Sequence, residues 1–164
     1  MTHEESAALN ALVMGSLTYS ELAKMFPEVS LRGNQRLLKW LGEAAHKRDP
    51  ERLDAVMQVL WHYESFDTSY TLTLCEIGEE DWHDLHEDVV SMLQEIRDPR
   101  SVEALFRIAN STHLYLEYDD AYALAAKCCY ALRDIGDEHA HAKLASLAND
   151  SRDPVRVAAR KLTT

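Results

Sequence analysis

Apolar residues recur at steps of three and four along most of this chain, with polar residues between them. One such stripe consists of Trp82, Leu85, Val89, Met92, Leu93 and Ile96. A second, 39 residues later, consists of Ala121, Leu124, Cys128, Ala131, Leu132 and Ile135. This spacing places the apolar side chains on one face of a helix. The pattern therefore predicts an all-α protein built from amphipathic helices.

The two stripes belong to a longer self-match within the sequence. Residues 93–99 reappear as residues 132–138, and a partial third copy aligns residues 49–59 with 98–108. The register then holds at further positions, pairing Leu105 with Leu144, Ile108 with Leu147, Ala109 with Ala148 and Asn110 with Asn149. A period near 40 with helical spacing is typical of helical repeat arrays. Such arrays usually bind other molecules rather than catalyse reactions.

Capping residues indicate where the helices begin and end. Three of the four prolines directly follow an aspartate, at Asp49, Asp98 and Asp153. Aspartate suits the N-cap and proline suits the first helical position, while Gly136 suits a left-handed C-cap. The predicted elements are two short helices at about 3–15 and 18–26, helix pairs at about 34–47 with 50–63, 81–96 with 99–111 and 120–135 with 138–149, and a last helix at about 154–162.

This pattern resembles the HEAT-repeat family. The matching residues are the Leu-x-x-Ile-x-Asp-Pro run at 93–99, its copy at 132–138, and the run 153–159, which looks like the opening of another unit. The resemblance implies a right-handed α-solenoid of about three stacked antiparallel helix pairs. It also implies a single domain over 1–164, with cap helices in 1–33, repeats at 34–63, 81–111 and 120–149, and a terminal helix at 154–162.

Two long connections interrupt the period, at 64–80 and 112–119. Each joins the second helix of one predicted pair to the first helix of the next, so we expect both at the same edge of the array. The net charge of −11 is concentrated near them, because residues 76–120 hold 13 acidic and 3 basic residues. Charge of one sign in one region favours a basic partner and disfavours nucleic acid.

Tyrosines and carboxylates of these connections form the predicted partner-binding surface. Tyrosine offers a large contact area with a polar tip, and acids pair with lysine and arginine. The predicted binding residues are Tyr63, Phe66, Tyr70, Glu76, Glu79, Glu80, Asp81, Asp84, Glu87, Asp88, Tyr115, Glu117, Tyr118, Asp119 and Asp120. The alternative is that these are ordinary solvated loops whose tyrosines pack into the core.

The sequence contains one candidate for an enzymatic site, the pair His86-Glu87. Deoxyhypusine hydroxylases, which are HEAT proteins that resemble this chain, hold two irons with His-Glu pairs on successive repeats. Here the positions 39 residues later are Ala125 and Ala126, so the pair occurs once. A metal needs several converging ligands. We therefore expect no metal, no cofactor and no catalytic residue, with His83 and His86 on a solvated helix face.

The three cysteines indicate no disulfide framework, because their number is odd and Cys128 and Cys129 are adjacent. The 39-residue shift aligns that pair with Val89 and Val90, so we expect both thiols in the core. Cys75 falls in the first long connection. No signal peptide and no apolar run long enough to span a membrane are visible. These features predict a cytoplasmic protein.

The sequence thus predicts a non-enzymatic protein-interaction module of unknown oligomeric state. Its size, helical repeats and acidity resemble those of bacterial immunity proteins, which bind and neutralise secreted toxins with basic surfaces. Two alternatives from other classes stay open. One is a HEAT-type enzyme related to iron hydroxylases or pigment lyases. The other is a HEAT-like nucleic-acid-binding protein, although the aligned helix faces carry mixed rather than basic charge.

Overall fold

The computed structural model describes residues 1–120 and 122–163. Across these residues it contains ten α-helices and three short 3₁₀ turns, with no strand, so the all-α prediction is confirmed. The chain divides into two compact units, Met1–Thr73 and Leu74–Thr164. We call them the N-terminal and the C-terminal unit. Ala121, which the sequence places in the second apolar stripe and in the helix predicted at 120–135, lies outside the described residues.

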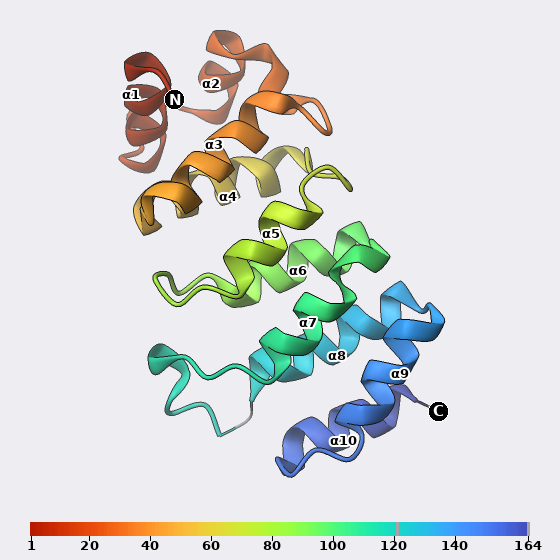
Figure 1. Ribbon diagram of the computed structural model, residues 1–164. Coiled ribbons are helices and arrows are strands. Elements are labelled where there is room, and N and C mark those ends of the chain that lie inside the picture. The colour runs from red at the N-terminus through yellow and green to blue at the C-terminus, as the bar shows by residue number, and fades with distance from the viewer. Residues whose placement is uncertain (121, 164) are drawn as a thin grey trace. The chain divides into compact units, whose positions relative to one another are not determined.

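The N-terminal unit contains α1 (His3–Val13), α2 (Tyr19–Met25), α3 (Gln35–Lys47) and α4 (Pro50–Tyr63), with a 3₁₀ turn at Pro27–Ser30. The α1 and α3 helices both pack against α4 (Figure 1). Thr2 and Thr18 cap the first two helices through capping boxes, and Asn34 and Asp49 cap the other two. Each cap oxygen accepts a hydrogen bond from a backbone N–H that would otherwise lack a partner.

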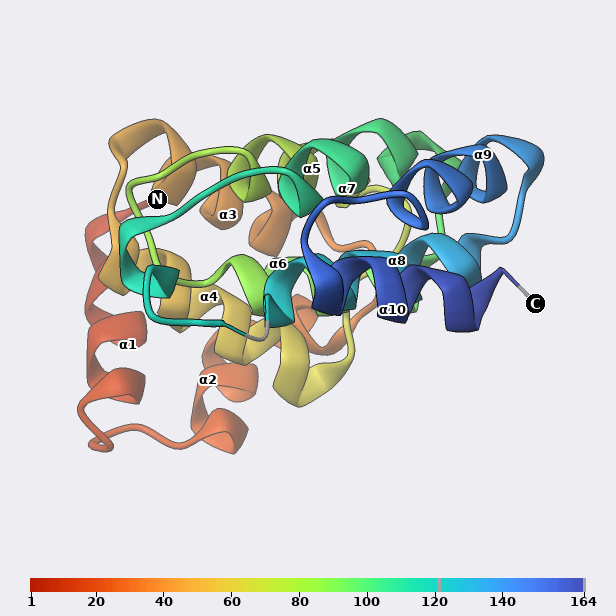
Figure 2. The ribbon, with the colours of Figure 1, turned by 90° about the horizontal axis from the view of Figure 1, so that it is seen from below.

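The C-terminal unit contains two layers of helices. The helices α6 (His86–Ile96), α8 (Ala123–Ile135) and α10 (Asp153–Leu162) lie side by side, with α8 packed against both neighbours. The helices α7 (Val102–Ala109) and α9 (Glu138–Leu147) cover them, as Figure 2 shows. In the part of the chain that the structure describes, no helix is both long enough and apolar enough to cross a membrane.

Positions 39 residues apart have the same structural role in the C-terminal unit. Arg97 and Gly136 both end a helix in the left-handed conformation, with φ of 55° and 68°. Asp98 and Asp137 then both accept a hydrogen bond from a backbone N–H of the following turn. Aligned core positions are also buried alike, as in the pairs Leu93 with Leu132, Leu105 with Leu144, Val89 with Cys128 and Val90 with Cys129. The sequence register is therefore also a structural register.

One predicted connection contains a helix that the sequence analysis missed. The helix α5 (Thr71–Gly78) occupies most of the second half of the 64–80 stretch. Its Leu74, Cys75 and Ile77 are buried, so its formation depends on tertiary packing rather than on a long amphipathic stripe. At its end Gly78 lies so close to α6 and α7 that an added Cβ would be 2.7 Å from Cδ1 of Ile108.

The structure also corrects the start of the helix predicted at 81–96 and the N-cap of the last helix. The helix predicted from residue 81 begins at His86, because His83 ties the preceding loop to itself. Its Nδ1 accepts from the Leu85 N–H, and its Nε2 lies 2.8 Å from the Ile77 carbonyl oxygen. Such side-chain bonds compete with helix formation. At the last helix Arg152, not Asp153, is the N-cap, and Asp153 is the first helical residue.

Candidate interaction surface and pocket

The three aromatic candidates of the N-terminal unit are not available for an extended contact surface. Tyr70 is fully buried, and its hydroxyl donates to the Asn34 carbonyl oxygen at 2.9 Å. Phe66 is also buried and packs edge-on against Trp61. The hydroxyl of Tyr63, which is half-buried, donates to the Tyr19 carbonyl oxygen. These side chains hold their unit together, as the alternative interpretation of the loops expected.

The other tyrosine candidates lie in the C-terminal unit, on the stretch between α7 and α8, of which the structure describes residues 110–120 and 122. We call it the tyrosine segment. It holds a 3₁₀ turn at Leu114–Leu116 and exposes Leu114 and Tyr118 to 89% and 92% of their areas. Large apolar side chains as exposed as these are a common mark of interaction sites. Tyr115 and Tyr122 are partly exposed beside them.

The tyrosine segment is anchored at both of its ends. At its far end the Asp119 carboxylate accepts from the Ala123 N–H at 2.6 Å, which caps α8 because Tyr122 offers no side-chain cap. At its near end the Asn110 side-chain oxygen accepts from the Arg152 guanidinium at 3.3 Å. The exposed side chains are therefore presented from a segment held to the helices on either side.

A cluster of three histidines anchors the middle of the tyrosine segment. The ring of His86 is fully buried at the start of α6, between the rings of His83 and His113, at centroid distances of 4.4 and 3.6 Å. Its Nε2 lies 2.7 Å from the Glu80 carbonyl oxygen, which can only accept, so Nε2 carries the proton. Its Nδ1 therefore accepts from the Tyr115 hydroxyl at 3.0 Å.

The hydrogen-bond partners of the three rings give each histidine one ring proton, so we infer that all three are neutral. His83 donates to the Ile77 carbonyl oxygen and accepts from a backbone N–H. His113 Nε2 donates to the Ser111 hydroxyl oxygen, whose own proton goes to the Ile108 carbonyl. His113 Nδ1 is buried and has no hydrogen-bond partner among the described residues. Burial lowers the pKa of His86 to about 4 and also lowers the pKa of His83 and of His113. The expectation that His83 and His86 are solvent-exposed was wrong.

The iron-binding lead is not supported by the arrangement of these groups. Both ring nitrogens of His86 are committed to hydrogen bonds with protein groups, and Glu87 forms an ion pair with Lys127 at 3.0 Å. Among the described residues no group of three or more His, Cys, Asp or Glu side chains is arranged to hold a metal ion.

The cysteines lie in apolar surroundings. Cys128 and Cys129 are fully buried, which confirms their predicted core position. Burial raises the pKa of all three thiols, to about 11 for Cys129 and about 12 for Cys75. A high pKa leaves little thiolate, the reactive form. Cys75 is thus a packed residue of α5 and not part of an exposed loop.

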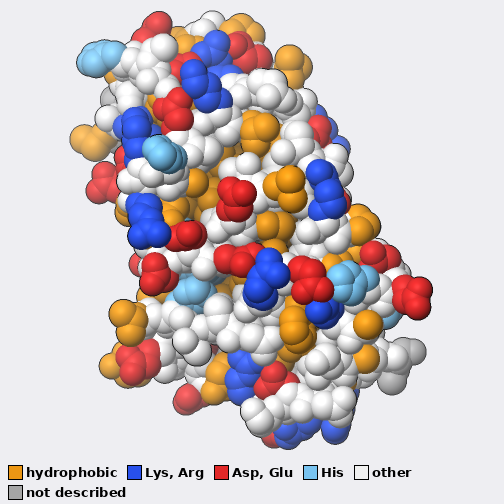
Figure 3. Space-filling model, viewed as in Figure 1, with side chains coloured by type: hydrophobic (Ala, Val, Ile, Leu, Met, Phe, Trp, Pro, Cys, Tyr) orange, Lys and Arg blue, Asp and Glu red, His pale blue; other side chains and the backbone are white. Residues whose placement is uncertain are grey.

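The acidic candidates of residues 76–88 differ in their surroundings. Glu79 forms a two-point ion pair with Arg107, and Figure 3 shows acidic and basic side chains alternating over α5, α7 and α9. That helical face is therefore close to balanced in charge. By contrast, Asp81, Asp84 and Asp88 are exposed near the tyrosine segment. Burial and then the charges of Glu87, Asp84 and Asp88 raise the pKa of Tyr115 to about 12.

The structure therefore brings part of the predicted surface together. The members that lie on the tyrosine segment or close to its histidine anchor and Tyr115 are Glu80, Asp81, Asp84, Glu87, Asp88, Tyr115, Glu117, Tyr118, Asp119 and Asp120. Glu76 is exposed on α5, and Glu79 is paired on the α5–α7–α9 face. Sequence reasoning missed His83, His86 and His113 as the anchor of this surface.

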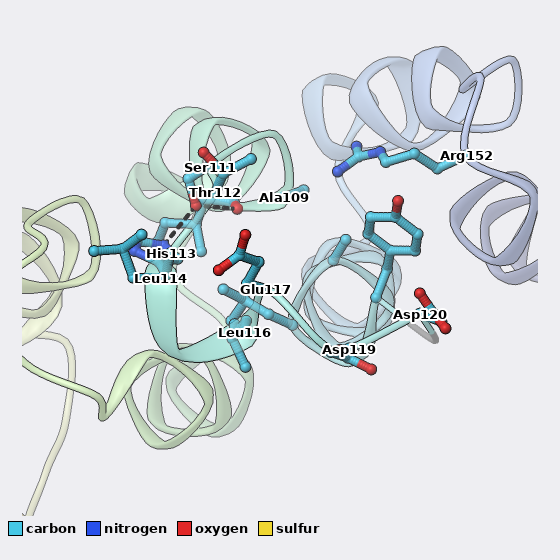
Figure 4. A pocket seen from close by; sticks show the side chains of 14 residues that line it. Ala109, Ser111, Thr112, His113, Leu114, Leu116, Glu117, Asp119, Asp120 and Arg152 are labelled. Carbon is cyan, nitrogen blue, oxygen red and sulfur yellow. Dashed lines mark hydrogen bonds between the residues drawn. The ribbon is translucent and has the colours of Figure 1, made fainter.

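A pocket of about 500 Å³ lies beneath the tyrosine segment. Its apolar lining comes from α7, α8 and the segment itself, and includes Ile108, Leu116 and Leu124. The Glu117 carboxylate projects into its middle, below Ser111 and Thr112, and Arg152 lies across the open space (Figure 4). Sequence reasoning did not find this pocket, because it forms only when the stretch 108–125 folds back on itself and Arg152 is brought against it.

The two charged side chains of the pocket differ in their partners. Arg152 is bound at two points by Asp150, at 2.7 and 2.9 Å, and lies over the Tyr122 ring. Its hydrogen bonds to Asp150 raise its pKa. Within the part of the chain that the structure describes, Glu117 has neither an ion-pair partner nor a side-chain hydrogen bond. The uncompensated charge of the pocket is therefore negative.

Comparison of the chain with protein-family models, with curated proteins and with solved structures returned no match.

Proposed function

We propose that this protein is a non-enzymatic binding module that recognises a basic protein through the tyrosine segment and the carboxylates around it. One observation carries this proposal. A segment anchored by the histidine cluster and by Asp119 presents Leu114 and Tyr118 almost fully to solvent. A solvated linker would not need such anchoring, and exposed apolar side chains that gather on one anchored segment are a common mark of interaction sites.

Electrostatics favours a basic partner over other classes. The exposed Asp84 and Asp88 lie close enough to Tyr115 to affect its pKa, and the exposed Glu117 and Asp120 lie beside Tyr118 along the chain. Opposite charge on a partner would speed its approach and fix its orientation, whereas the phosphates of nucleic acid would be repelled. Aromatic side chains in the centre with charges around them are the usual composition of a protein-binding surface.

We also propose that the scaffold carrying this surface is a HEAT-like right-handed α-solenoid. Its support is the 39-residue equivalence of caps and core positions in the C-terminal unit. In its most specific form, the proposal is a cytoplasmic bacterial immunity protein whose partner is a secreted toxin with a basic surface. That form rests on the resemblance in size, helical repeats and charge.

The test measures binding to individually expressed products of the neighbouring genes, chosen for a basic surface. The test variant combines Glu117→Gln, Asp119→Asn and Asp120→Asn, which keeps the cap oxygen on residue 119. The control variant combines Glu4→Gln, Glu51→Gln and Glu95→Gln, exposed acids elsewhere. We expect the test variant to lower affinity at least about ten-fold and the control to change it less than about two-fold. Equal effects of both variants would overturn the proposal.

A further inference from the structure

We propose that the pocket beneath the tyrosine segment takes a cationic side chain, an arginine or a lysine, from the partner protein. This inference rests on the proposed function and specifies what its surface recognises. The volume of about 500 Å³ is within the range of pockets that hold small ligands, and it exceeds the needs of a single side chain. A basic residue together with its neighbour in a partner loop would fit.

The lining matches the two parts of a long basic side chain. Such side chains bury an apolar stem and keep the charged head at a polar group. Ile108, Leu116 and Leu124 provide apolar contact for the stem. The Glu117 carboxylate, which projects into the same space, provides an acceptor for the head (Figure 4).

The bonding of the neighbouring groups assigns this role to Glu117. Asp119 already accepts from the Ala123 N–H, so its carboxylate is engaged in capping α8. Arg152 does not neutralise Glu117, because its guanidinium is bound at two points by Asp150. A carboxylate without a partner beside apolar walls favours a cation that brings its own hydrogen-bond donors.

The arrangement excludes an anionic ligand as the occupant. A carboxylate or phosphate in this space would face Glu117, and Asp120 also lines the pocket. Arg152, the one lysine or arginine among the described lining residues, has its charge compensated by Asp150. A neutral apolar ligand would leave the Glu117 charge partly desolvated without compensation.

The experiment uses the full chain and a defined probe, N-acetyl-arginine amide, followed by amide chemical shifts in NMR. N-acetyl-citrulline amide is the neutral probe of nearly the same shape. Glu117→Gln removes the proposed acceptor. Glu95→Gln removes an exposed charge that neither lines the pocket nor belongs to the proposed binding surface. Both substitutions preserve side-chain shape, and unchanged spectra of the free variants would verify the fold.

We expect saturable shifts at Ala109, Leu116, Leu124 and Ala125 with the arginine probe. Glu117→Gln should weaken that binding about five-fold or more, and Glu95→Gln should leave it unchanged. Citrulline should bind several-fold more weakly. Equal binding by the Glu117→Gln variant, equal binding of citrulline, or shifts spread evenly over the acidic surface would overturn the inference.

This experiment also separates the two proposals. If the probe binds at Glu117 but the segment variants leave partner affinity unchanged, the pocket assignment stands and the proposed function fails. If partner affinity depends on the segment while the probe does not bind in the pocket, the proposed function stands and the pocket assignment fails.

Discussion

The hydroxyl of Tyr115 lies 3.0 Å from Nδ1 of His86, a residue 29 positions earlier in the chain. Because the other ring nitrogen donates to the Glu80 carbonyl oxygen, this hydroxyl must donate. The bond joins the tyrosine segment to the start of α6. Through this bond the buried His86 ring holds the exposed tyrosine segment in place.

Removing that hydroxyl should destabilise the C-terminal unit. Tyr115→Phe leaves a buried imidazole nitrogen without a donor, which costs about 1 kcal/mol in the free energy of unfolding. Urea unfolding measures this cost, and amide exchange within 110–122 should become faster. Tyr118→Phe is the matched control, because Tyr118 is almost fully exposed and its change should stay below about 0.5 kcal/mol. Equal effects of the two substitutions would contradict the assigned bond.

The histidine cluster should make stability depend on pH. Burial lowers the pKa of His86 from 6.5 to about 4, so between these values the unfolded chain binds more protons than the folded chain. The contribution of His86 to the free energy of unfolding is therefore complete above pH 6.5 and is lost as the pH falls from 6.5 to about 4. Its size for His86 is about 3 kcal/mol. His83 and His113 act in the same direction.

A variant without the titrating ring isolates this contribution. His86→Leu should be less stable than the unmodified chain at pH 7, and the two should converge as the pH approaches 4. Chemical unfolding at several pH values measures the difference. Parallel stability curves for the two proteins would mean that His86 titrates normally and is not buried as described.

Two glycines give a matched test of the packing. An added Cβ at Gly78 would be 2.7 Å from Cδ1 of Ile108 and 3.2 Å from Cγ1 of Val89, whereas at Gly42 it would meet nothing within 4 Å. Gly78→Ala should therefore destabilise by about 1–3 kcal/mol. Gly42→Ala should stabilise by up to about 1 kcal/mol, since alanine favours helix. Thermal unfolding distinguishes the two outcomes, and a neutral Gly78→Ala would contradict the position of α5.

The repeat register predicts opposite responses at two equivalent C-caps. Gly136→Ala places a Cβ on a left-handed residue and 3.3 Å from the Arg133 carbonyl oxygen, so it should cost about 1 kcal/mol. Arg97 already has that conformation with φ of 55°. Arg97→Gly should therefore leave stability unchanged or raise it. Denaturant midpoints would show this contrast, and a destabilised Arg97→Gly variant would argue against equivalence.

Much of the helical framework could be predicted, because local signals and the period agreed. The caps at Asp49 and Asp98 and the C-cap at Gly136 were all found from sequence. The helix α5 could not be found in this way. Its sequence is short and mixes leucines with threonines, so its helical state depends on burial against neighbouring helices.

The candidate site was predictable only in part, and His86 shows why. The 39-residue shift aligns it with Ala125, which is buried, just as the shift aligned Cys128 with buried Val89. The same register would thus have placed His86 in the core. The pocket has no such signal, because Ile108, Glu117 and Arg152 come together only through the fold.

A hydrogen-exchange footprint of the full chain, alone and bound to its basic partner, tests most directly whether the tyrosine segment is the binding surface. If it is, the partner should protect amides in 110–122 and at the start of α8. Raising the salt concentration should weaken the complex, because the contact is electrostatic. Protection confined to Met1–Thr73, with exchange in 110–122 unchanged by the partner, would show that the tyrosine segment is not the binding surface.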